Sequence, residues 1–397
     1  MLYVYQGDWP RNATRVRKQT RALAEAGHTV RLLAGNPNDK PRREVVEWMD
    51  VERVSVLGPP ALSRYLAFPI FANPFWVWEI WRTARRFHAD CLIVRDLPLA
   101  PAALAVASLL GVPVHYEMAD VYPVAMRANR GDHPGLISRF SRNAAAAELL
   151  DRLVVRRASS VFVVSAESRE RCLSLGAAPE SAVIVGNTPT ILPDLDLDPP
   201  LPPDLAGWEG KLIVLFLGNL LADRGLLEAV EAVARARQAV PEIAFAIVGD
   251  GREQQRLAGR IAALEAGEFV RLLGWKGESD HAAYYRHASI GILPFLDTEH
   301  INITLANKLF DYMAAALPVV ASDARPMRRV LTETGAGILV PPGDIAALAG
   351  ALVELARNPG RRRQLGARGR WAVEHEYAWA EDRRRLLAAV ARAGGRR

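Results

Sequence analysis

The sequence predicts an α/β protein made of two doubly wound parallel sheets that face each other across a cleft. Three observations predict this fold. Short apolar runs alternate with amphipathic helical patterns along the whole 397-residue chain. A proline-rich stretch near the middle divides this alternation into two halves. The composition, 50% hydrophobic and 24% charged, is ordinary for a globular protein with more than one core.

The first half, residues 1–187, is expected to form the first domain. Its strand-like runs are "LYVY", "TVRLLA", "CLIV", "VPVHYE" and "SSVFVVS", and residues 14–26 form a helical pattern between the first two. Residues 97–116 carry no acidic or basic side chain, apart from one histidine. Three prolines and a glycine interrupt this stretch, so we expect a helix, a turn and a strand there rather than a membrane span.

Residues 188–210 are expected to be a stiff, extended linker, because six prolines lie in this stretch. Asp194, Asp196 and Asp198 alternate within it. Such a pattern can bind a divalent metal on a nucleotide-sugar. We favour a solvated acidic linker, since the residues flank prolines in an extended chain, and we predict no metal site.

The second half, residues 211–377, repeats the pattern with "KLIVLFLG", "IAFAIVG", "FVRLLG", "SIGILP", "LPVVAS" and "AGILV", and with a helix over residues 226–239. Residues 378–397 form a last segment, with a helix over residues 378–393 and no strand of its own. By analogy with other two-domain α/β proteins, we expect this helix to cross back to the first domain.

Charge and cysteine content narrow the function classes. The net charge is +6 and the isoelectric point about 9.5, which favours phosphate-bearing ligands. The basic residues are scattered without interleaved aromatics, so a nucleic-acid role is not expected. Two cysteines without metal-ligand spacing fit a reducing compartment, and the strand-like start "MLYVYQGDWP" does not resemble a signal peptide. We therefore expect a cytoplasmic protein.

The turns that follow the second-half strands hold the clearest candidate site. Gly218 and Asn219 end the run "KLIVLFL", and Arg224 with the next glycine then opens a helix. An arginine beside free helix N–H groups can bind an anion, although a solvent-exposed arginine is the simpler interpretation of this piece alone. Gly249 lies in the next such turn, where a glycine pair by itself indicates only a tight turn.

A charge pair on an otherwise apolar helix is the most specific signal. In "NITLANKLFDYMAAALPVVASD", Thr304 is expected to cap the helix and leave the following N–H groups free, near Leu305 and Asn307. Lys308 lies near that start, and the carboxylate of Asp311 suits a vicinal diol. The alternative is an internal ion pair between these two residues.

The order of these pieces resembles glycosyltransferase family 4, the retaining nucleotide-sugar transferases with the glycosyltransferase-B fold. The resemblance covers nearly the whole chain. It rests on "RVRKQTRALAEAGHTVRLLA", "RRASSVFVVSAESRERC", "GNLLADRGLLEAVEA", "VGDGREQQRL" and "NKLFDYMAAALPVVASD". It implies that Asp311 binds the nucleotide ribose and that Arg224 binds the donor diphosphate. The turn from Thr304 to Asn307 would offer N–H groups to the same phosphates, so that positive groups replace a metal.

The sequence also departs from the family pattern. Ile303 stands where the first acid of the family's E-x7-E pattern is expected, and Ala119 where "YEMADVYP" should hold a histidine. Asn219 replaces an arginine and Ala316 a glycine. These changes keep open a catalytically degenerate nucleotide-binding protein. A nucleotide-sugar epimerase on the same fold is a further alternative, but no acid–base cluster supports it.

The first half offers weaker site candidates. Asp120 is the residue that we expect to contact the sugar, with a turn or cap role as the alternative. Gly7, Asp8 and Arg15 follow the first strand or open the first helix, and we assign them to the acceptor side. Residues 64–87 are aromatic and basic. They are typical of either a membrane-surface contact or, as we favour, a helix that packs on the core.

The sequence thus predicts a retaining, metal-independent glycosyltransferase that works in the cytoplasm, with possible contact to the inner face of the membrane. Its donor would be a nucleoside-diphosphate sugar, with UDP expected from the family, and it would need no other cofactor. The expected setting is bacterial glycan, glycolipid or secondary-metabolite synthesis. The acceptor and the transferred sugar cannot be read from the residues.

Overall fold

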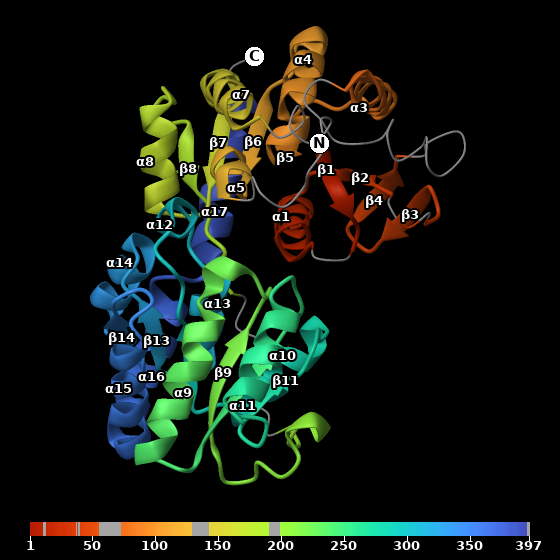
Figure 1. Ribbon diagram of the computed structural model, residues 1–397. Coiled ribbons are helices and arrows are strands. Elements are labelled where there is room, and N and C mark those ends of the chain that lie inside the picture. The colour runs from red at the N-terminus through yellow and green to blue at the C-terminus, as the bar shows by residue number, and fades with distance from the viewer. Residues whose placement is uncertain are drawn as a thin grey trace. The chain divides into compact units, whose positions relative to one another are not determined.

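The structure is a computed structural model that describes residues 1–10, 13–36, 38, 40–54, 73–128, 143–189 and 199–394. The chain divides into two compact units (Figure 1). The first unit contains residues Met1–Gly186 and Ala380–Arg397, and the second contains Asn187–Trp379. Asp194, Asp196 and Asp198, with the possible metal site, lie outside the described residues.

The first unit is built on an eight-stranded sheet of order β3-β4-β2-β1-β5-β6-β7-β8. All neighbouring strands are parallel except β3, which pairs antiparallel with β4. The elements are β1 (Leu2–Asp8), α1 (Thr14–Glu25), β2 (Arg31–Gly35), β3 (Arg43–Val46), β4 (Met49–Arg53), α3 (Pro74–Arg86), β5 (Leu92–Arg95), η1 (Leu97–Leu99), α4 (Ala100–Leu110), β6 (Val114–Met118), α5 (Tyr122–Ala128), α7 (Ala144–Arg157), β7 (Ser160–Val163), α8 (Ala166–Ser174), β8 (Ala182–Ile184) and α17 (Trp379–Gly394).

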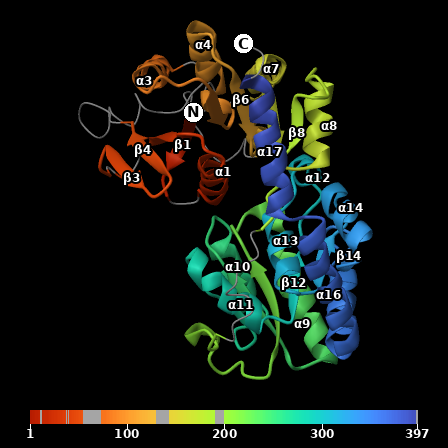
Figure 2. The same cartoon turned by 180° about the vertical axis from the view of Figure 1, so that it is seen from behind.

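The last helix, α17, belongs to the first unit from Ala380 onward and is seen at the front in Figure 2. Its Leu386 is fully buried, and Arg383 forms an ion pair of 3.7 Å with Glu25 of α1. The helix predicted over residues 378–393 is therefore observed, shifted by one residue. The chain leaves the first unit at Gly186 and comes back to it only with this helix.

The second unit is built on a six-stranded, wholly parallel sheet of order β11-β10-β9-β12-β13-β14. Every strand is short, and all but the edge strand β11, which contains Arg271, lack charged residues, as expected for strands buried between two helical layers. The elements are η3 (Pro203–Leu205), β9 (Leu212–Leu217), η4 (Ala222–Arg224), α9 (Leu226–Ala239), β10 (Ile243–Val248), α10 (Gln254–Ala263), β11 (Val270–Leu272), η5 (Glu278–Asp280), α11 (His281–His287), β12 (Ile290–Leu293), α12 (Glu299–Ile303), α13 (Asn307–Ala314), β13 (Val319–Ser322), α14 (Arg325–Thr334), β14 (Gly337–Val340), α15 (Ile345–Arg357) and α16 (Pro359–His375).

Each sheet has one point at which the direction of winding reverses. In the second unit the chain proceeds from β9 outward to β11 and then returns to β12 on the other side of β9. In the first unit the reversal lies between β1 and β5. Doubly wound sheets bind their ligands at the carboxyl ends of the strands beside such a point. The two reversals therefore indicate where to look for sites.

The structure also tests the expectation for residues 97–116. Residues 97–116 form η1, α4, a turn and β6, which confirms the predicted helix, turn and strand. Within the described ranges, no helix combines the length and the apolar character that crossing a bilayer would need.

Candidate active site

Two glycine turns follow β9 and β10 and lie directly against each other. The N–H of Leu220 donates to the carbonyl of Asp250 at 2.8 Å. A Cβ on Gly249 would lie 1.9 Å from the carbonyl oxygen of Gly218, and one on Gly251 would lie 2.3 Å from that of Leu220. Both positions also have positive φ, which disfavours any other residue. The glycines are therefore required for a backbone surface at the carboxyl edge of the sheet.

Arg224 lies at the reversal point of the second sheet. It ends the short η4 turn, and α9 begins two residues later, so the arginine precedes the helix rather than opening it. Its guanidinium carbon lies 4.6 Å from the centre of the Phe295 ring, which follows β12. A Cβ on Gly225 would lie 1.9 Å from the carbonyl oxygen of Pro294. The turns after the two reversal strands are thus packed together, with the guanidinium fixed on an aromatic face.

The charge of Arg224 is partly balanced by its neighbours. Its Nε lies 3.7 Å from Oδ1 of Asp223, whose Oδ2 lies 3.6 Å from Nδ1 of His300. Burial works to raise the pKa of Asp223, but His300 and Arg224 outweigh burial and hold this pKa below its usual value. Asp223 therefore stays ionised and holds the two basic groups at one corner of the site.

Lys308 and Asp311 form the ion pair that the sequence left as an alternative. Lys308 Nζ lies 2.9 Å from Asp311 Oδ2, and each side chain is about one quarter exposed. The hydroxyl of Tyr285, from α11, contacts both groups, at 3.4 Å from Asp311 and 3.3 Å from Lys308. Burial and the Asp311 charge raise the pKa of Tyr285, which keeps its hydroxyl protonated and able to donate. Without a ligand, the carboxylate is therefore held by a lysine and a phenol.

The predicted cap at Thr304 is wrong. The stretch forms two short helices, and Thr304 ends the first, α12, with its hydroxyl donating to the carbonyl of His300 at 2.8 Å. The second, α13, begins at Asn307 after Ala306, which makes no side-chain capping bond. Leu305 between them is buried. The first N–H groups of α13 are those of Asn307 and Lys308, in the turn where a helix lacks internal acceptors.

Arg15 has a structural position in the first unit. It is 8% exposed and forms an ion pair with Glu117 of β6. It also donates to the carbonyls of Val185 at 2.6 Å and Gly186 at 2.8 Å. Glu117 accepts a further bond of 2.7 Å from Gln19 of α1. Arg15 thus ties α1 to the sheet and to the chain after β8.

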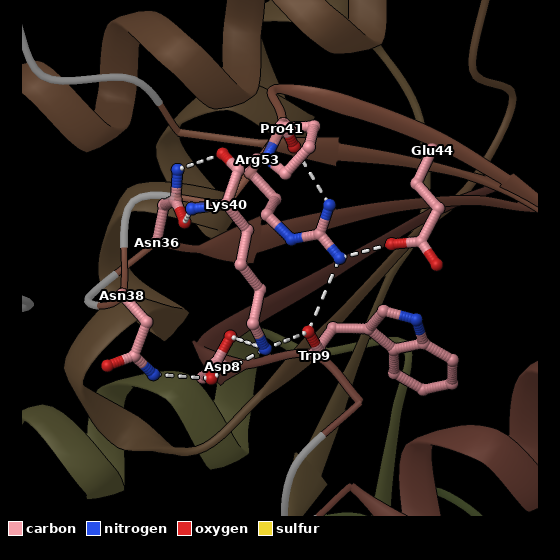
Figure 3. A network of polar contacts seen from close by, with 8 residues as sticks. All are labelled: Asp8, Trp9, Asn36, Asn38, Lys40, Pro41, Glu44 and Arg53. Carbon is pink, nitrogen blue, oxygen red and sulfur yellow. Dashed lines mark hydrogen bonds and ion pairs between the residues drawn. The ribbon is translucent and has the colours of Figure 1, made fainter.

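Asp8 is held in the polar network of Figure 3. Lys40 Nζ lies 2.8 Å from both carboxylate oxygens, and Asn38 donates to one of them at 2.7 Å. Lys40 and Arg53 also donate to the carbonyl of Trp9, at 3.0 and 3.3 Å. These contacts hold Asn38 and Lys40 against the end of β1, so the carboxylate of Asp8 already has its partners.

Gly7 and Asp120 have local roles that the structure shows directly. A Cβ on Gly7 would lie 2.3 Å from the Tyr5 hydroxyl, so glycine is needed for the Tyr5 ring to lie along the strand end. Asp120 Oδ1 accepts the N–H of Val121 at 2.8 Å, which is the turn role that the sequence left open. Asp120 is partly exposed.

The sequence interpretation missed a cluster beside Asp120. The cluster lies at the carboxyl edge of the first sheet. Gln6 is in the last part of β1, and Arg95 is the last residue of β5 and is followed by Asp96. Tyr122 is the first residue of α5, which follows β6. The signal was the pair "RD" at the end of the run "CLIV". The pair becomes informative only when β5 is known to lie beside β1.

The aromatic stretch over residues 64–87 is described from residue 73 onward, and residues 64–72 lie outside the described ranges. One side of α3 packs on the core through Trp76 and Ile80, as we favoured. The other side leaves Trp78 54% exposed, with its ring 5.1 Å from that of Trp81, on which Arg85 stacks at 5.5 Å. The helix therefore combines a core face with an aromatic and basic outer face.

Comparisons with known proteins agree with this arrangement. Residues 13–188 match the model of the glycosyl transferase 4-like domain, and residues 211–358 match that of the glycosyl transferases group 1. A phosphatidyl-myo-inositol mannosyltransferase of Mycobacterium leprae is 38% identical over 49% of this chain and 51% of its own length. The chain thus aligns with about half the length of that relative.

Two further proteins align over most of the chain. A 2-deoxystreptamine glucosyltransferase of Streptomyces kanamyceticus is 23% identical over 87% of this chain and 89% of its own. An Anabaena protein crystallised with UDP superposes with a TM-score of 0.71, at 15% identity, over 98% of this chain and 99% of its own. This superposition shows the fold, which is that of the glycosyltransferase-B proteins.

The two family models together span most of both units. The chain therefore belongs to the family 4 type of glycosyltransferases.

Proposed function

We propose that the protein transfers a sugar from a nucleoside-diphosphate sugar to a hydroxylated acceptor. The observation that carries this proposal is the pairing of Arg224 with Phe295 at the reversal point of the second sheet, beside two glycine turns. A fixed guanidinium directly before the start of α9, whose first N–H groups lack acceptors within the helix, suits a diphosphate. The family models support transfer as the reaction, and none of the relatives reported above supports the epimerase alternative.

The donor is assigned as follows. Arg224, the backbone of Gly218, Asn219 and Gly249, and the first turn of α13 bind the diphosphate. Asp311 binds the two ribose hydroxyls. The ribose then replaces Lys308 at the carboxylate, and the lysine turns to the phosphates. The Anabaena structure with UDP supports UDP as the nucleotide.

The reaction is proposed to retain the anomeric configuration and to need neither a metal ion nor another cofactor. Arginine, lysine and backbone N–H groups would stabilise the leaving diphosphate in place of a metal. The enzyme would work in the cytoplasm. Trp78 and the basic groups of α3 would bring it to the inner face of the membrane, and the phosphatidyl group in the mycobacterial relative's name supports such a contact.

A nucleotide-binding protein without transferase activity is the second candidate. It is favoured by Ala119 and Ile303, which stand where the family places a histidine and an acid. The two candidates share the donor site and differ in turnover.

Isothermal titration with UDP, GDP and ADP, followed by donor hydrolysis and transfer assays, tests the proposal. We expect UDP to bind best and UDP-sugars to be turned over. The acceptors to try first are myo-inositol and 2-deoxystreptamine, because both are hydroxylated six-membered rings and both occur in the names of relatives. Binding without turnover would favour the second candidate. Failure of all three nucleotides to bind at millimolar concentration would overturn the donor site itself.

A further inference from the structure

The reversal point of the first sheet lies between β1 and β5. The chain proceeds from β1 to β2 and β4 on one side, and later to β5, β6, β7 and β8 on the other. Ligands bind at the carboxyl ends of strands beside such a point. In the second unit this place holds an arginine stacked on an aromatic ring. The first unit has the same arrangement, because Arg95 lies 5.3 Å from the centre of the Tyr5 ring.

The backbone departs from regular geometry at both strand ends. In β1 the register with β2 shifts between Tyr5 and Asp8, so the pairing is irregular at Gln6 and Gly7. Pairing irregularities such as bulges re-aim side chains and occur next to active sites. Directly after β5, Asp96 has φ +68°, a left-handed conformation that a non-glycine residue adopts only under constraint from its surroundings. Both irregularities direct polar side chains to the same edge of the sheet.

Polar atoms in this cluster are buried without a hydrogen-bond partner among the described residues. They are Gln6 Oε1, Asp96 Oδ1 and Nη1 of Arg95, whereas Nε of Arg95 forms an ion pair with Asp96. Asp96 is 7% exposed, and its other oxygen lies 3.5 Å from the Arg95 guanidinium. Gln6 donates its amide N–H to the Tyr122 hydroxyl. Buried polar groups are nearly always paired, so unpaired atoms from three side chains in one place indicate a missing partner.

The charges select the kind of partner. Burial raises the pKa of Asp96 to about 7; Arg95 and Arg15 work against this, and Asp120 and Glu117 add to it. Burial also raises the pKa of Tyr122, so its phenol keeps its proton. The cluster therefore offers donors and acceptors together. The nearby carboxylates disfavour an anion, whereas a hydroxyl group donates and accepts at once.

We infer that Gln6, Arg95, Asp96 and Tyr122 form a hydroxyl-binding subsite that takes a polyol, and that Asp96 is its principal hydrogen-bond acceptor. The polyol is the sugar or cyclitol portion of the acceptor, an identification that rests on the proposed transferase function. Gln6, Arg95 and Tyr122 are partly exposed and give the subsite its access to solvent, whereas Asp96 is buried. Asp8 and Arg15, which the sequence indicated instead, are tied into internal networks.

The test measures polyol binding apart from nucleotide binding. The probes are myo-inositol and glucose, titrated against the full chain by saturation-transfer NMR, with cyclohexanol as the apolar ring of the same size. Asp96→Asn keeps the shape of the side chain and removes the charge. We expect it to weaken binding of the polyols about tenfold. Gln6→Ala changes a partly exposed position and serves as the second variant if Asp96→Asn fails to fold.

Asp50→Asn is the matched control, because Asp50 is another acid of the first unit, lies on β4 and is paired with Arg31 at 2.7 Å. It should leave polyol binding unchanged, and UDP binding should be equal in all variants. Absence of polyol binding to the wild-type chain at about 0.1 M, or equal binding by wild type, Asp96→Asn and Gln6→Ala, would overturn the inference and leave a buried water as the partner of these atoms. If UDP fails to bind while Asp96→Asn still loses the polyol, the proposed function fails and the subsite stands.

Discussion

Replacement of Asp311 by alanine separates a ligand-binding role from a structural one, because the two roles predict effects of different size. In the free protein Asp311 is paired with Lys308 at 2.9 Å, one turn of helix away, and the pair is about one quarter exposed. Such a pair contributes about 0.2–0.5 kcal/mol. With the weak bond from Tyr285 at 3.4 Å, the loss in the free energy of unfolding should stay below about 1 kcal/mol.

The effect on nucleotide binding should be larger. If the carboxylate accepts both ribose hydroxyls, its removal costs about 1.5–3 kcal/mol, which weakens UDP binding about 10- to 150-fold. The assay is isothermal titration of wild type and Asp311→Ala with UDP and with 2′,3′-dideoxy-UDP. The dideoxy ligand should bind both proteins with similar, weak affinity, because it lacks the groups that Asp311 would hold.

Glu381→Ala serves as the control, since it removes a carboxylate paired with an arginine at the same spacing, 2.7 Å away, on α17. It should leave UDP binding unchanged. The reasoning would be refuted if folded Asp311→Ala bound UDP within a factor of two of wild type. It would also be refuted if the mutation weakened binding of the dideoxy ligand as much as binding of UDP, since the lost affinity would then not come from the ribose hydroxyls.

Four further outcomes are expected. Arg224→Ala should weaken the binding of UDP strongly and the binding of uridine hardly at all. Arg224→Lys should recover only part of the UDP affinity, because a lysine lacks the planar fork that stacks on a ring. Equal losses of affinity for both ligands would show that the role of the arginine is structural. Turnover should survive EDTA, and its abolition with rescue by Mg²⁺ or Mn²⁺ would contradict the metal-free site. Gly225→Ala should lower the free energy of unfolding in urea by more than Gly210→Ala. Both have positive φ, which costs about 1–2 kcal/mol, but only Gly225 has a carbonyl 1.9 Å from the added Cβ. Burial raises the pKa of Asp96 to about 7, above its unfolded value, so its burial should cost stability increasingly as pH rises from about 4 to 7. When the free energy of unfolding is measured at several pH values in that range, Asp96→Asn should therefore lose less stability than wild type as the pH rises. Parallel curves of unfolding free energy against pH for the two proteins would show that the Asp96 carboxyl does not cause the pH dependence.

The parts of the fold that depend on local pattern could be predicted from sequence. Helix α9 spans Leu226–Ala239, as its periodicity predicted, and the apolar runs became buried strands. Strand β3 was missed because its "REVV" is largely exposed and pairs at the edge of the sheet. An edge strand of this kind has no apolar run to reveal it.

Contacts between residues close together in the sequence could be predicted, whereas contacts that depend on the order of strands in a sheet could not. Lys308 and Asp311 are neighbours on one helix, so their ion pair could be named from the sequence as the alternative to ligand binding. Thr304 was misjudged because a hydroxyl can bond back to the preceding turn as well as cap the next one, and the sequence does not distinguish these. Asp96 and Gln6 are brought together only by the adjacency of β1 and β5.

The return of the chain to its first unit has a consequence for synthesis on the ribosome. The second unit is one continuous stretch, so it can fold as soon as it has emerged. The first unit emerges earlier but must wait for α17, whose buried Leu386, Ala389 and Val390 are made only after the whole second unit. During that interval the surface that α17 later covers remains open to chaperones and to other nascent chains. The order of translation is thus the reverse of the order in which the two units can be completed.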